Sequence, residues 1–337
     1  MQQTVVPLPS FVQIEPVGQC NLRCQMCPIQ FRTDGPPYGP PAFMPFETFT
    51  RLVDQLPSMT ELQLQGLGEP LMHPRFFDMV AYAVARGVEV STNSNLTLLT
   101  PARAERMVES GLHKLHASID GSTQETYERI RVRSSWRRVI DNLEGLVAAK
   151  RRLGSELPEL RIVMVLMRQN LDELADLVRL AASIGVTSVW VQHLCHDFGE
   201  ESLPVHYLPM HQFVGEQTLV GEDPARVDRA YAAARTAAAE HGVDLRLPNL
   251  TPRPLPPGTR GPDRCDFPWR GAYYSYDGRA MPCCMVATPD RINFGNAAQA
   301  GVIPIWESAD FQRFRDQLDS DDPPDICRSC AVYNRTF

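Results

Sequence analysis

The sequence contains no run of about 18 apolar residues, so it predicts no transmembrane helix. Its first residues, MQQTVVPLPS, lack the charged region followed by an apolar stretch that marks a secretory signal peptide. Together, these two absences indicate a protein of the cytoplasm.

The sequence also lacks an excess of positive charge. It has 33 lysine and arginine residues against 40 aspartate and glutamate residues, which gives a formal net charge of −7. A protein that binds nucleic acid or an anionic membrane needs cationic side chains to neutralise the phosphates. We therefore expect neither partner. The hydrophobic fraction of 43% is typical of a globular protein.

Disulfides are not expected in the reducing cytoplasm, so the nine cysteines need another explanation. Eight of them fall into two groups, and Cys195 stands alone. The members of the two groups are Cys20, Cys24 and Cys27, and then Cys265, Cys283, Cys284, Cys327 and Cys330. Cysteines grouped in this way indicate a metal ion or an iron–sulfur cluster.

Short β-rich segments alternate with amphipathic segments over the first 195 residues. The predicted strands are 11–15, 61–65, 88–91, 114–118, 161–166 and 188–192. The predicted helices between them are 45–56, 75–86, 101–110, 136–152 and 171–184. This alternation predicts an α/β fold whose parallel strands are joined by right-handed crossovers. The six βα units fit either a partial (βα)6 barrel, similar to a TIM barrel, or an open sheet.

The remaining sequence divides into two further parts. Residues 222–240 are predicted as a helix, and the proline-rich stretch 248–262 is predicted as a linker. A short segment with five cysteines follows. The predicted domains are a core over 8–205, a helical and proline-rich linker over 206–262, and a small cysteine-rich domain over 263–337.

The first cysteine group lies directly after the first predicted strand, at the edge of a parallel sheet where chemistry gathers. Its sequence is Cys20-Asn-Leu-Arg-Cys24-Gln-Met-Cys27. Three thiolates can bind three irons of a four-iron cluster and leave one iron open, whereas ferredoxin-type runs supply four cysteines. The alternative is a zinc site completed by a remote histidine, and the unequal spacing after a strand argues against it.

This Cys-x3-Cys-x2-Cys pattern resembles the radical S-adenosylmethionine (SAM) family, although Met26 stands where that family usually has an aromatic residue. The resemblance implies that SAM binds the open iron of a [4Fe–4S] cluster. It also implies that one electron, from a flavodoxin- or ferredoxin-type reductant, cleaves SAM to methionine and a 5′-deoxyadenosyl radical. That radical abstracts hydrogen from the substrate.

Three later segments strengthen the resemblance. Residues 66–70, Gly-Leu-Gly-Glu-Pro, are similar to the family's Gly-Gly-Glu-Pro element, which implies that Glu69 pairs with the SAM ammonium. Residues 91–95 resemble its Thr-Asn-Gly stretch, with Ser94 in place of the glycine, and residues 118–121 resemble its Ser-x-Asp-Gly segment. The implied SAM contacts are Gly66, Gly68, Glu69, Thr92, Asn93, Asn95, Ser118, Asp120 and Arg131. Taken singly each segment could be an ordinary turn, but their order after successive strands favours a cofactor site.

The second cysteine group is similar to the SPASM and shorter twitch domains that follow many such cores. The implied ligands of one auxiliary [4Fe–4S] cluster are Cys265, Cys283, Cys327 and Cys330. Cys284 is a neighbour that could take the place of Cys283. A zinc ribbon normally has two Cys-x2-Cys knuckles, and this sequence has one.

A core with one auxiliary cluster resembles the dehydrogenase and epimerase enzymes of aminoglycoside biosynthesis. We therefore expect radical oxidation or epimerisation of a small polar metabolite in a biosynthetic pathway. Cys195 follows the last predicted strand and would suit an epimerase as a hydrogen-atom donor, although a buried apolar cysteine is the ordinary alternative. The histidines His116, His193 and His196 are candidate bases or structural residues.

Two other classes of function compete with this expectation. A peptide or protein maturase, of the sulfatase-activating or peptide cross-linking type, commonly has two auxiliary clusters or a leader-peptide domain, and the sequence predicts neither. An electron-transfer protein would not need an open three-cysteine site beside residues 66–69. Formation of 5′-deoxyadenosine from SAM would distinguish either enzyme from an electron-transfer protein.

Overall fold

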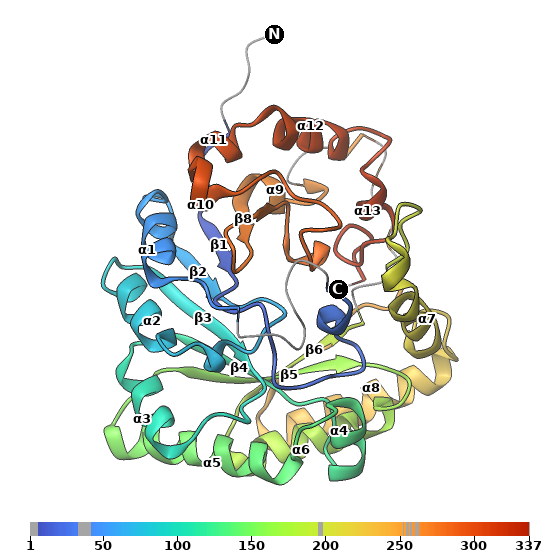
Figure 1. The fold of residues 1–337 in the computed structure, drawn as a ribbon. Coiled ribbons are helices and arrows are strands. Elements are labelled where there is room, and N and C mark those ends of the chain that lie inside the picture. Colours follow the sequence, from blue (N-terminus) through green and yellow to red (C-terminus); the bar gives the residue numbers. More distant parts are fainter. Residues whose placement is uncertain are drawn as a thin grey trace.

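The computed structural model describes residues 6–32, 42–194, 198–251, 253, 256, 258–259 and 263–336. The strands in these residues form a curved sheet in the order β7-β6-β5-β4-β3-β2-β1-β8-β9, an open barrel with helices outside it (Figure 1). Their bounds are β1 (Phe11–Ile14), β2 (Glu61–Leu64), β3 (Glu89–Ser94), β4 (Lys114–Ser118), β5 (Glu159–Leu166), β6 (Ser188–His193), β7 (Asp244–Arg246), β8 (Gly271–Tyr274) and β9 (Ala280–Met281). All neighbouring strands are parallel except β8 and β9.

The helices begin and end where local sequence signals predict. Thr100 caps α3 by accepting a hydrogen bond from the Arg103 amide, and Pro101 occupies the first turn. Gly154 and Gly185 end α5 and α6 in the left-handed conformation. The bounds are α1 (Phe46–Asp54), α2 (Phe76–Val84), α3 (Pro101–Glu109), α4 (Gln124–Ile130), α5 (Trp136–Leu153), α6 (Leu174–Ile184), α7 (Leu208–Gln217), α8 (Pro224–His241), α9 (Phe267–Arg270), α10 (Ala297–Ala300), α11 (Val302–Trp306), α12 (Ala309–Leu318) and α13 (Asp325–Arg328).

The strands alternate between a buried apolar side and a half-buried polar side. In β6, Val189 and Val191 are buried, whereas Ser188, Trp190 and Gln192 are half-buried. Because successive side chains of a strand point to opposite faces, the apolar set packs against the outer helices and the polar set lines the interior of the barrel. The barrel therefore has a polar interior.

The structure confirms an α/β fold with a mostly parallel sheet and adds β7 to the six strands predicted for the core. β7 lies in the segment predicted as a linker, which also contributes α7 and α8. β8 comes from the cysteine-rich segment and pairs in parallel with β1, so the last domain continues the barrel sheet. β3 runs to Ser94, three residues further than predicted, because Asn93 on its half-buried side faces the barrel interior rather than a loop. The short helix α4 was not predicted.

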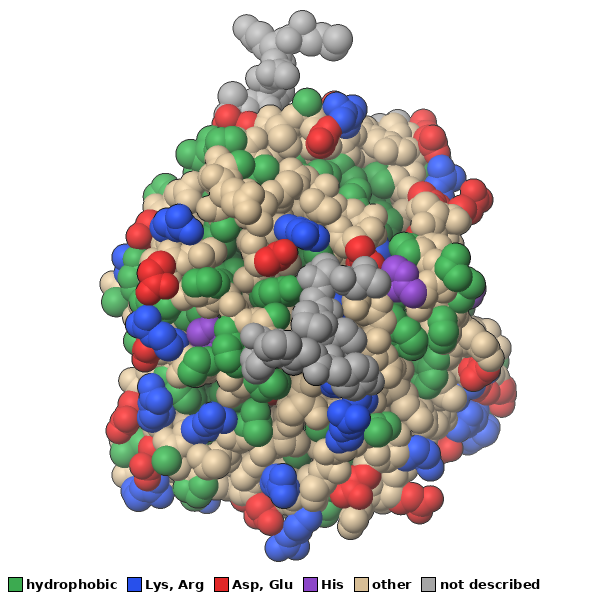
Figure 2. Space-filling view, in the orientation of Figure 1, with side chains coloured by type: hydrophobic (Ala, Val, Ile, Leu, Met, Phe, Trp, Pro, Cys, Tyr) green, Lys and Arg blue, Asp and Glu red, His purple; other side chains and the backbone are tan. Residues whose placement is uncertain are grey.

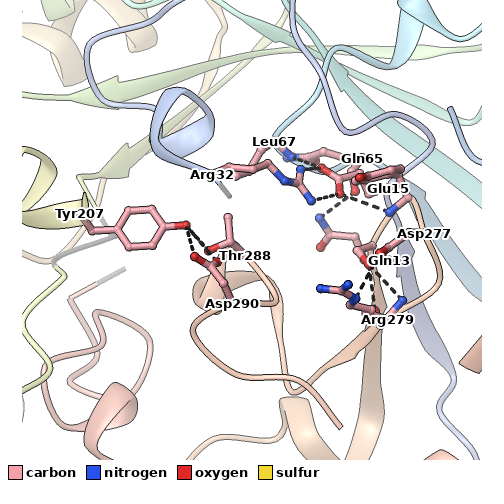
Figure 3. A network of polar contacts seen from close by, with 12 residues as sticks. Gln13, Glu15, Arg32, Gln65, Leu67, Tyr207, Asp277, Arg279, Thr288 and Asp290 are labelled. Carbon is pink, nitrogen blue, oxygen red and sulfur yellow. Dashed lines mark hydrogen bonds and ion pairs between the residues drawn. The ribbon is translucent and has the colours of Figure 1, made fainter. Parts of the chain in front are cut away.

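Polar contacts also join the segment after β6 to the C-terminal domain. The Tyr207 hydroxyl lies 2.6 Å from the Thr288 hydroxyl and 3.1 Å from Asp290 (Figure 3). The ion pair between Glu200 and Arg291, at 2.5 Å, is almost completely buried. The start of α7 is therefore held by the domain that carries the second cysteine group.

No helix in the described part of the chain is long and apolar enough to cross a membrane. Figure 2 shows basic and acidic side chains interspersed over one face of the molecule.

Candidate active site and auxiliary cluster site

The first three cysteines lie between β1 and the short 3-10 helix η1 (Pro28–Phe31). Cys24 is buried, and Cys20 and Cys27 are half-buried. Burial is the main cause that raises the pKa of all three thiols, and it raises that of Cys24 to about 12. Repulsion between neighbouring thiolates raises the pKa values of Cys20 and Cys24 further. Three close thiols that resist ionisation on their own fit an iron cluster, whose positive charge would hold them as thiolates.

Backbone hydrogen bonds fix the cysteine loop against the end of α4. The amide of Arg23 donates to the Val132 carbonyl at 3.0 Å, and the amide of Gln25 donates to the Ile130 carbonyl at 2.9 Å. Because these bonds use the backbone, the loop conformation does not depend on the thiols themselves. These bonds therefore fix the backbone of the loop, and the binding of a cluster by its three thiols stays a prediction.

Glu69 is a buried acid in the loop after β2. Its Oε1 accepts hydrogen bonds from the Ser94 hydroxyl at 2.7 Å and the Leu71 amide at 3.1 Å, and its Oε2 accepts one from the Asn95 amide at 2.8 Å. Burial raises the pKa of the carboxyl, and these hydrogen bonds oppose that rise. Glu69 also lies near enough to Cys20 to raise the pKa of that thiol. The structure thus brings Glu69, the end of β3 and the cysteine loop together.

Gly68 allows the two loops to touch. A Cβ atom at this position would lie 2.0 Å from the Val17 carbonyl oxygen and 2.6 Å from that of Gln19. The amide of Glu69 donates to the same Gln19 carbonyl at 3.0 Å. Any side chain at position 68 would push the Glu69 loop away from the cysteine loop.

The implied SAM contacts at the ends of β3 and β4 have different surroundings in the structure. Thr92 is buried and donates to the Leu64 carbonyl at 2.7 Å, which places it within the sheet rather than on the cavity. Asn95 contacts the cysteine loop directly, because its Nδ2 lies 3.8 Å from Cys20 Sγ and 3.1 Å from Asn21 Oδ1. Ser118 ends β4 and is half-buried.

Asp120 and Arg131 form a buried ion pair beside the cysteine loop. Arg131 Nε lies 2.7 Å from Asp120 Oδ2, and Asp120 Oδ1 accepts a hydrogen bond from the Val165 amide at 2.8 Å. Arg131 Nη1 lies 4.0 Å from Cys24 Sγ. Asp120 therefore holds Arg131, and the guanidinium places a positive charge against a predicted cluster ligand.

Asn93 and His116, which the sequence analysis singled out, belong to a chain of hydrogen bonds across the barrel interior that also includes residues it did not. Gln63 Nε2 donates a hydrogen bond of 3.3 Å to Asn93 Oδ1. The same Asn93 oxygen lies 2.8 Å from His116 Nδ1. Arg161 Nη1 lies 3.3 Å from His116 Nε2 and its guanidinium packs 3.3 Å above the Trp190 ring. Burial, followed by the charge of Arg161, lowers the pKa of His116 to about 4. His116 is therefore neutral at neutral pH and accepts from Arg161.

Sequence reasoning also missed the ion pair between Glu15 and Arg32. Both side chains are almost completely buried, and two hydrogen bonds of 2.8 and 3.0 Å join them (Figure 3). Glu15 also accepts from the amides of Leu67 and Tyr276, at 3.0 and 3.3 Å. A Cβ atom at Gly66 would lie 2.3 Å from the Glu15 side chain. The pair thus ties the cysteine loop to the Gly66 loop and to the C-terminal domain. The sequence signal that could have found this pair is Glu15 itself, an acidic residue at the end of a buried strand.

The second cysteine group converges in the C-terminal domain. Cys283 and Cys284 follow β9, Cys327 lies on α13, and all five thiols of the group are half-buried. Burial raises the pKa of Cys283 well above its ordinary value, and the charges of the other four thiols raise it further. The charges of the five thiols therefore act on one another, and their role as ligands of a four-thiolate cluster stays a prediction. The assignment of Cys283 rather than Cys284 as a ligand stays a prediction.

The described part of the chain includes two of the candidate bases, His116 and His193. His193 is buried at the end of β6, and its Nε2 lies 3.2 Å from the Thr218 hydroxyl. Cys195 and His196 lie outside the described residues. The role of Cys195 as a hydrogen-atom donor stays a prediction.

The family model described as the radical SAM superfamily matches residues 14–181, a range that includes the three-cysteine loop, Glu69 and Arg131. The chain belongs to the radical SAM superfamily. A second model, described as an iron–sulfur cluster-binding domain and named SPASM, matches residues 265–331. This radical SAM enzyme therefore uses SAM, a [4Fe–4S] cluster and an auxiliary iron–sulfur cluster.

Three curated relatives are each 24% identical to this radical SAM enzyme. A tungsten-containing aldehyde ferredoxin oxidoreductase cofactor-modifying protein from Pyrococcus furiosus aligns with 90% of the chain and 83% of its own length. An AdoMet-dependent heme synthase from Methanosarcina barkeri aligns with 96% and 88%, and a PqqA peptide cyclase from Ruegeria pomeroyi with 99% and 83%. Among solved structures, Streptococcus suis SuiB bound to the precursor peptide SuiA has a TM-score of 0.69 at 14% identity and covers 97% of this chain and 71% of its own. That likeness shows the shared fold.

Proposed function

We propose that this radical SAM enzyme is a maturase that modifies a peptide substrate. The observation that carries the proposal is the alignment of a peptide cyclase over 99% of the chain, which includes both cysteine groups. The two other relatives described above are a heme synthase and a cofactor-modifying protein. The small polar metabolite expected from the sequence is less well supported than a peptide, because no relative described above acts by name on such a compound.

The proposed roles of the site residues follow from their contacts. Cys20, Cys24 and Cys27 hold the catalytic cluster, and Glu69 with Asn95 forms the wall of the SAM site beside Cys20. When bound, SAM and its cluster supply a radical that abstracts hydrogen from an unactivated C–H bond. Asp120 positions Arg131, and the proposed auxiliary ligands are Cys265, Cys283, Cys327 and Cys330. The proposed domains remain 8–205, 206–262 and 263–337.

The substrate class is tested with short peptides encoded beside the gene. The anaerobically reconstituted protein is incubated with SAM, dithionite and each peptide, and the products are analysed by mass spectrometry. A peptide maturase forms 5′-deoxyadenosine together with a peptide of altered mass, and deuterium on the peptide transfers into 5′-deoxyadenosine. Turnover of SAM with every peptide unchanged, and with a small metabolite oxidised or epimerised instead, would contradict the proposal.

The cluster assignment is tested separately from the substrate. Replacing Cys20, Cys24 and Cys27 by alanine should abolish SAM cleavage and leave about four irons, held at the auxiliary site. Iron analysis and chromatography of 5′-deoxyadenosine measure the two quantities. Retained cleavage in this variant would refute the assignment.

A further inference from the structure

The segment that holds the cysteine loop through backbone hydrogen bonds is rich in arginine. Residues 129–138, which we call the arginine segment, contain five arginines and no aspartate or glutamate, whereas the whole chain has a net charge of −7. Arg131 is buried against Asp120. The other four arginines of the segment are exposed, and they are Arg129, Arg133, Arg137 and Arg138. The arginine segment is therefore a local concentration of positive charge on an acidic protein.

The acids that flank the arginine segment pair with it only at the surface. Glu125 lies 3.9 Å from Arg129, and Asp141 lies 2.9 Å from Arg137. Both pairs are exposed, and exposed ion pairs contribute little free energy. Glu128 instead accepts a hydrogen bond of 2.9 Å from the first amide of α5. Carboxylates of a partner could therefore replace Glu125 and Asp141 at little cost in free energy.

Val132 and Arg133 form the tip of a turn within the arginine segment. A hydrogen bond of 2.9 Å from the Ser134 amide to the Arg131 carbonyl closes this turn. Val132 is 40% exposed, which is uncommon among the large apolar side chains that the structure describes. Arg133 has a φ of 74°, and a positive φ at the third residue of a turn favours glycine. A strained arginine at a position that suits glycine indicates that its side chain has a function.

The same turn is bonded to the cysteine loop. The Val132 carbonyl accepts a hydrogen bond of 3.0 Å from the amide of Arg23, the residue before Cys24, and the Ile130 carbonyl accepts one of 2.9 Å from Gln25, the residue after it. One hydrogen bond and one peptide unit therefore separate the exposed Val132 from Cys24. Because the rate of electron transfer falls steeply with distance, this turn is a short route from the surface to the cysteine loop.

We propose that the arginine segment docks an acidic one-electron carrier protein, and that the electron enters at Val132 and passes through Cys24 to the cluster. Exposed arginines flank an apolar tip along the chain, which suits a small electron-transfer interface with a carboxylate-rich partner. In each encounter the carrier is oxidised by one electron and the cluster is reduced by one, with no bond made or broken. The electron route rests on the proposed cluster ligands, whereas the affinity for an acidic carrier does not.

The affinity is tested with two acidic probes, a flavodoxin and a ferredoxin, and the cluster-loaded protein. Anaerobic calorimetry measures the dissociation constant of each carrier at about 30 mM and about 300 mM salt. Arg133→Gly removes the charge and suits the positive φ, so the fold should stay intact. This variant should bind the tighter carrier about fivefold more weakly at the lower salt, and the difference should shrink at the higher salt. Wild-type affinity of Arg133→Gly for both carriers, or no binding of either carrier, would overturn the proposal.

Arg335→Gly is the matched control for the location. Arg335 is also an exposed arginine with a positive φ, of 57°, but it follows Cys330 in the C-terminal domain. Its replacement should leave the affinity for both carriers unchanged. An equal loss of affinity in Arg335→Gly and Arg133→Gly would show that the carriers respond to net charge alone, and would overturn the location.

Steady-state kinetics test the electron route. Val132→Asp places a negative charge at the tip of the turn and should raise the KM for the carrier about tenfold in carrier-driven SAM cleavage. Dithionite needs no docking surface, so SAM cleavage with dithionite should keep its wild-type rate. An unchanged KM for the carrier would overturn the route. If Val132→Asp also loses cleavage with dithionite, Arg133→Gly decides in the same assay.

The docking proposal and the cluster assignment fail in different ways. If Arg133→Gly binds the carriers normally while the triple variant of Cys20, Cys24 and Cys27 loses SAM cleavage, the docking proposal is wrong and the cluster assignment stands. If carrier binding depends on Arg133 and the triple variant still cleaves SAM, the cluster assignment is wrong and the route through Cys24 is wrong with it. If Arg133→Gly raises the KM for a peptide substrate and not for the carrier, the arginine segment is a peptide site and the docking proposal is wrong.

Discussion

Asp120 and Arg131 differ in the structure from what their sequence motif implies. The motif places both residues near SAM, whereas the structure shows that Asp120 is bonded to Arg131 and to a backbone amide. Sequence alone could not predict this, because an ion pair over 11 positions depends on the short helix α4 that separates them. By contrast, the grouping of the cysteines is visible in the sequence itself, because cluster chemistry constrains their spacing directly, and their roles as ligands stay predictions.

Arg131→Met should destabilise the protein by about 3–5 kcal/mol, because it leaves Asp120 buried without a counter-charge. The double variant Asp120→Leu with Arg131→Met removes both charges and should recover most of that stability. Unfolding midpoints of the two variants measure this difference.

The double variant also separates stability from electrostatics at the cluster. The guanidinium adds positive charge near Cys24 Sγ and so should favour the reduced cluster. Its loss should lower the reduction potential of the N-terminal cluster and slow SAM cleavage, even in a stable protein. A stable double variant with an unchanged potential would show that Arg131 is structural only.

At the scale of elements, the alternation of strands and helices predicted the order of the barrel correctly. The predicted strand ends were less accurate, since β3 continues through Ser94 into the polar interior. The pairing of β8 with β1 could not be predicted, because the two strands are more than 250 residues apart and nothing local links them. The close contact between the two catalytic loops depends on Gly68, which sequence marked only as part of a motif.

Gly68→Ala should separate these loops, because the added Cβ would lie 2.0 Å from the Val17 carbonyl oxygen. Backbone atoms cannot move aside as a flexible side chain can, so the variant should lose at least about tenfold in SAM cleavage and also lose stability. Gly145→Ala is the control, and it should stabilise the protein by about 0.5–1 kcal/mol, since it replaces a helical glycine without any clash. Wild-type SAM cleavage in Gly68→Ala would mean that the loops tolerate separation.

At the scale of the whole molecule, the barrel interior links protonation to stability. His116 has a pKa of about 4 in the folded protein, because burial and the nearby Arg161 disfavour its charged form. An exposed histidine titrates near 6.5, so between these values the unfolded chain binds a proton that the folded chain does not. This contribution therefore lowers stability as the pH falls from about 7 towards 4.

His116→Gln should remove the loss of stability that His116 causes at low pH, while keeping a polar side chain that can form a hydrogen bond with Asn93. From pH 7.5 to pH 5, the free energy of unfolding should fall by about 2 kcal/mol more in the wild-type protein than in the variant. Other groups, including His193, whose pKa is also lowered to about 4, titrate in both proteins and cancel in the comparison. Unfolding midpoints at several pH values give the two curves. Parallel curves would show that His116 is charged or exposed in the folded protein, and that the polar chain from Gln63 to Arg161 does not exist as described.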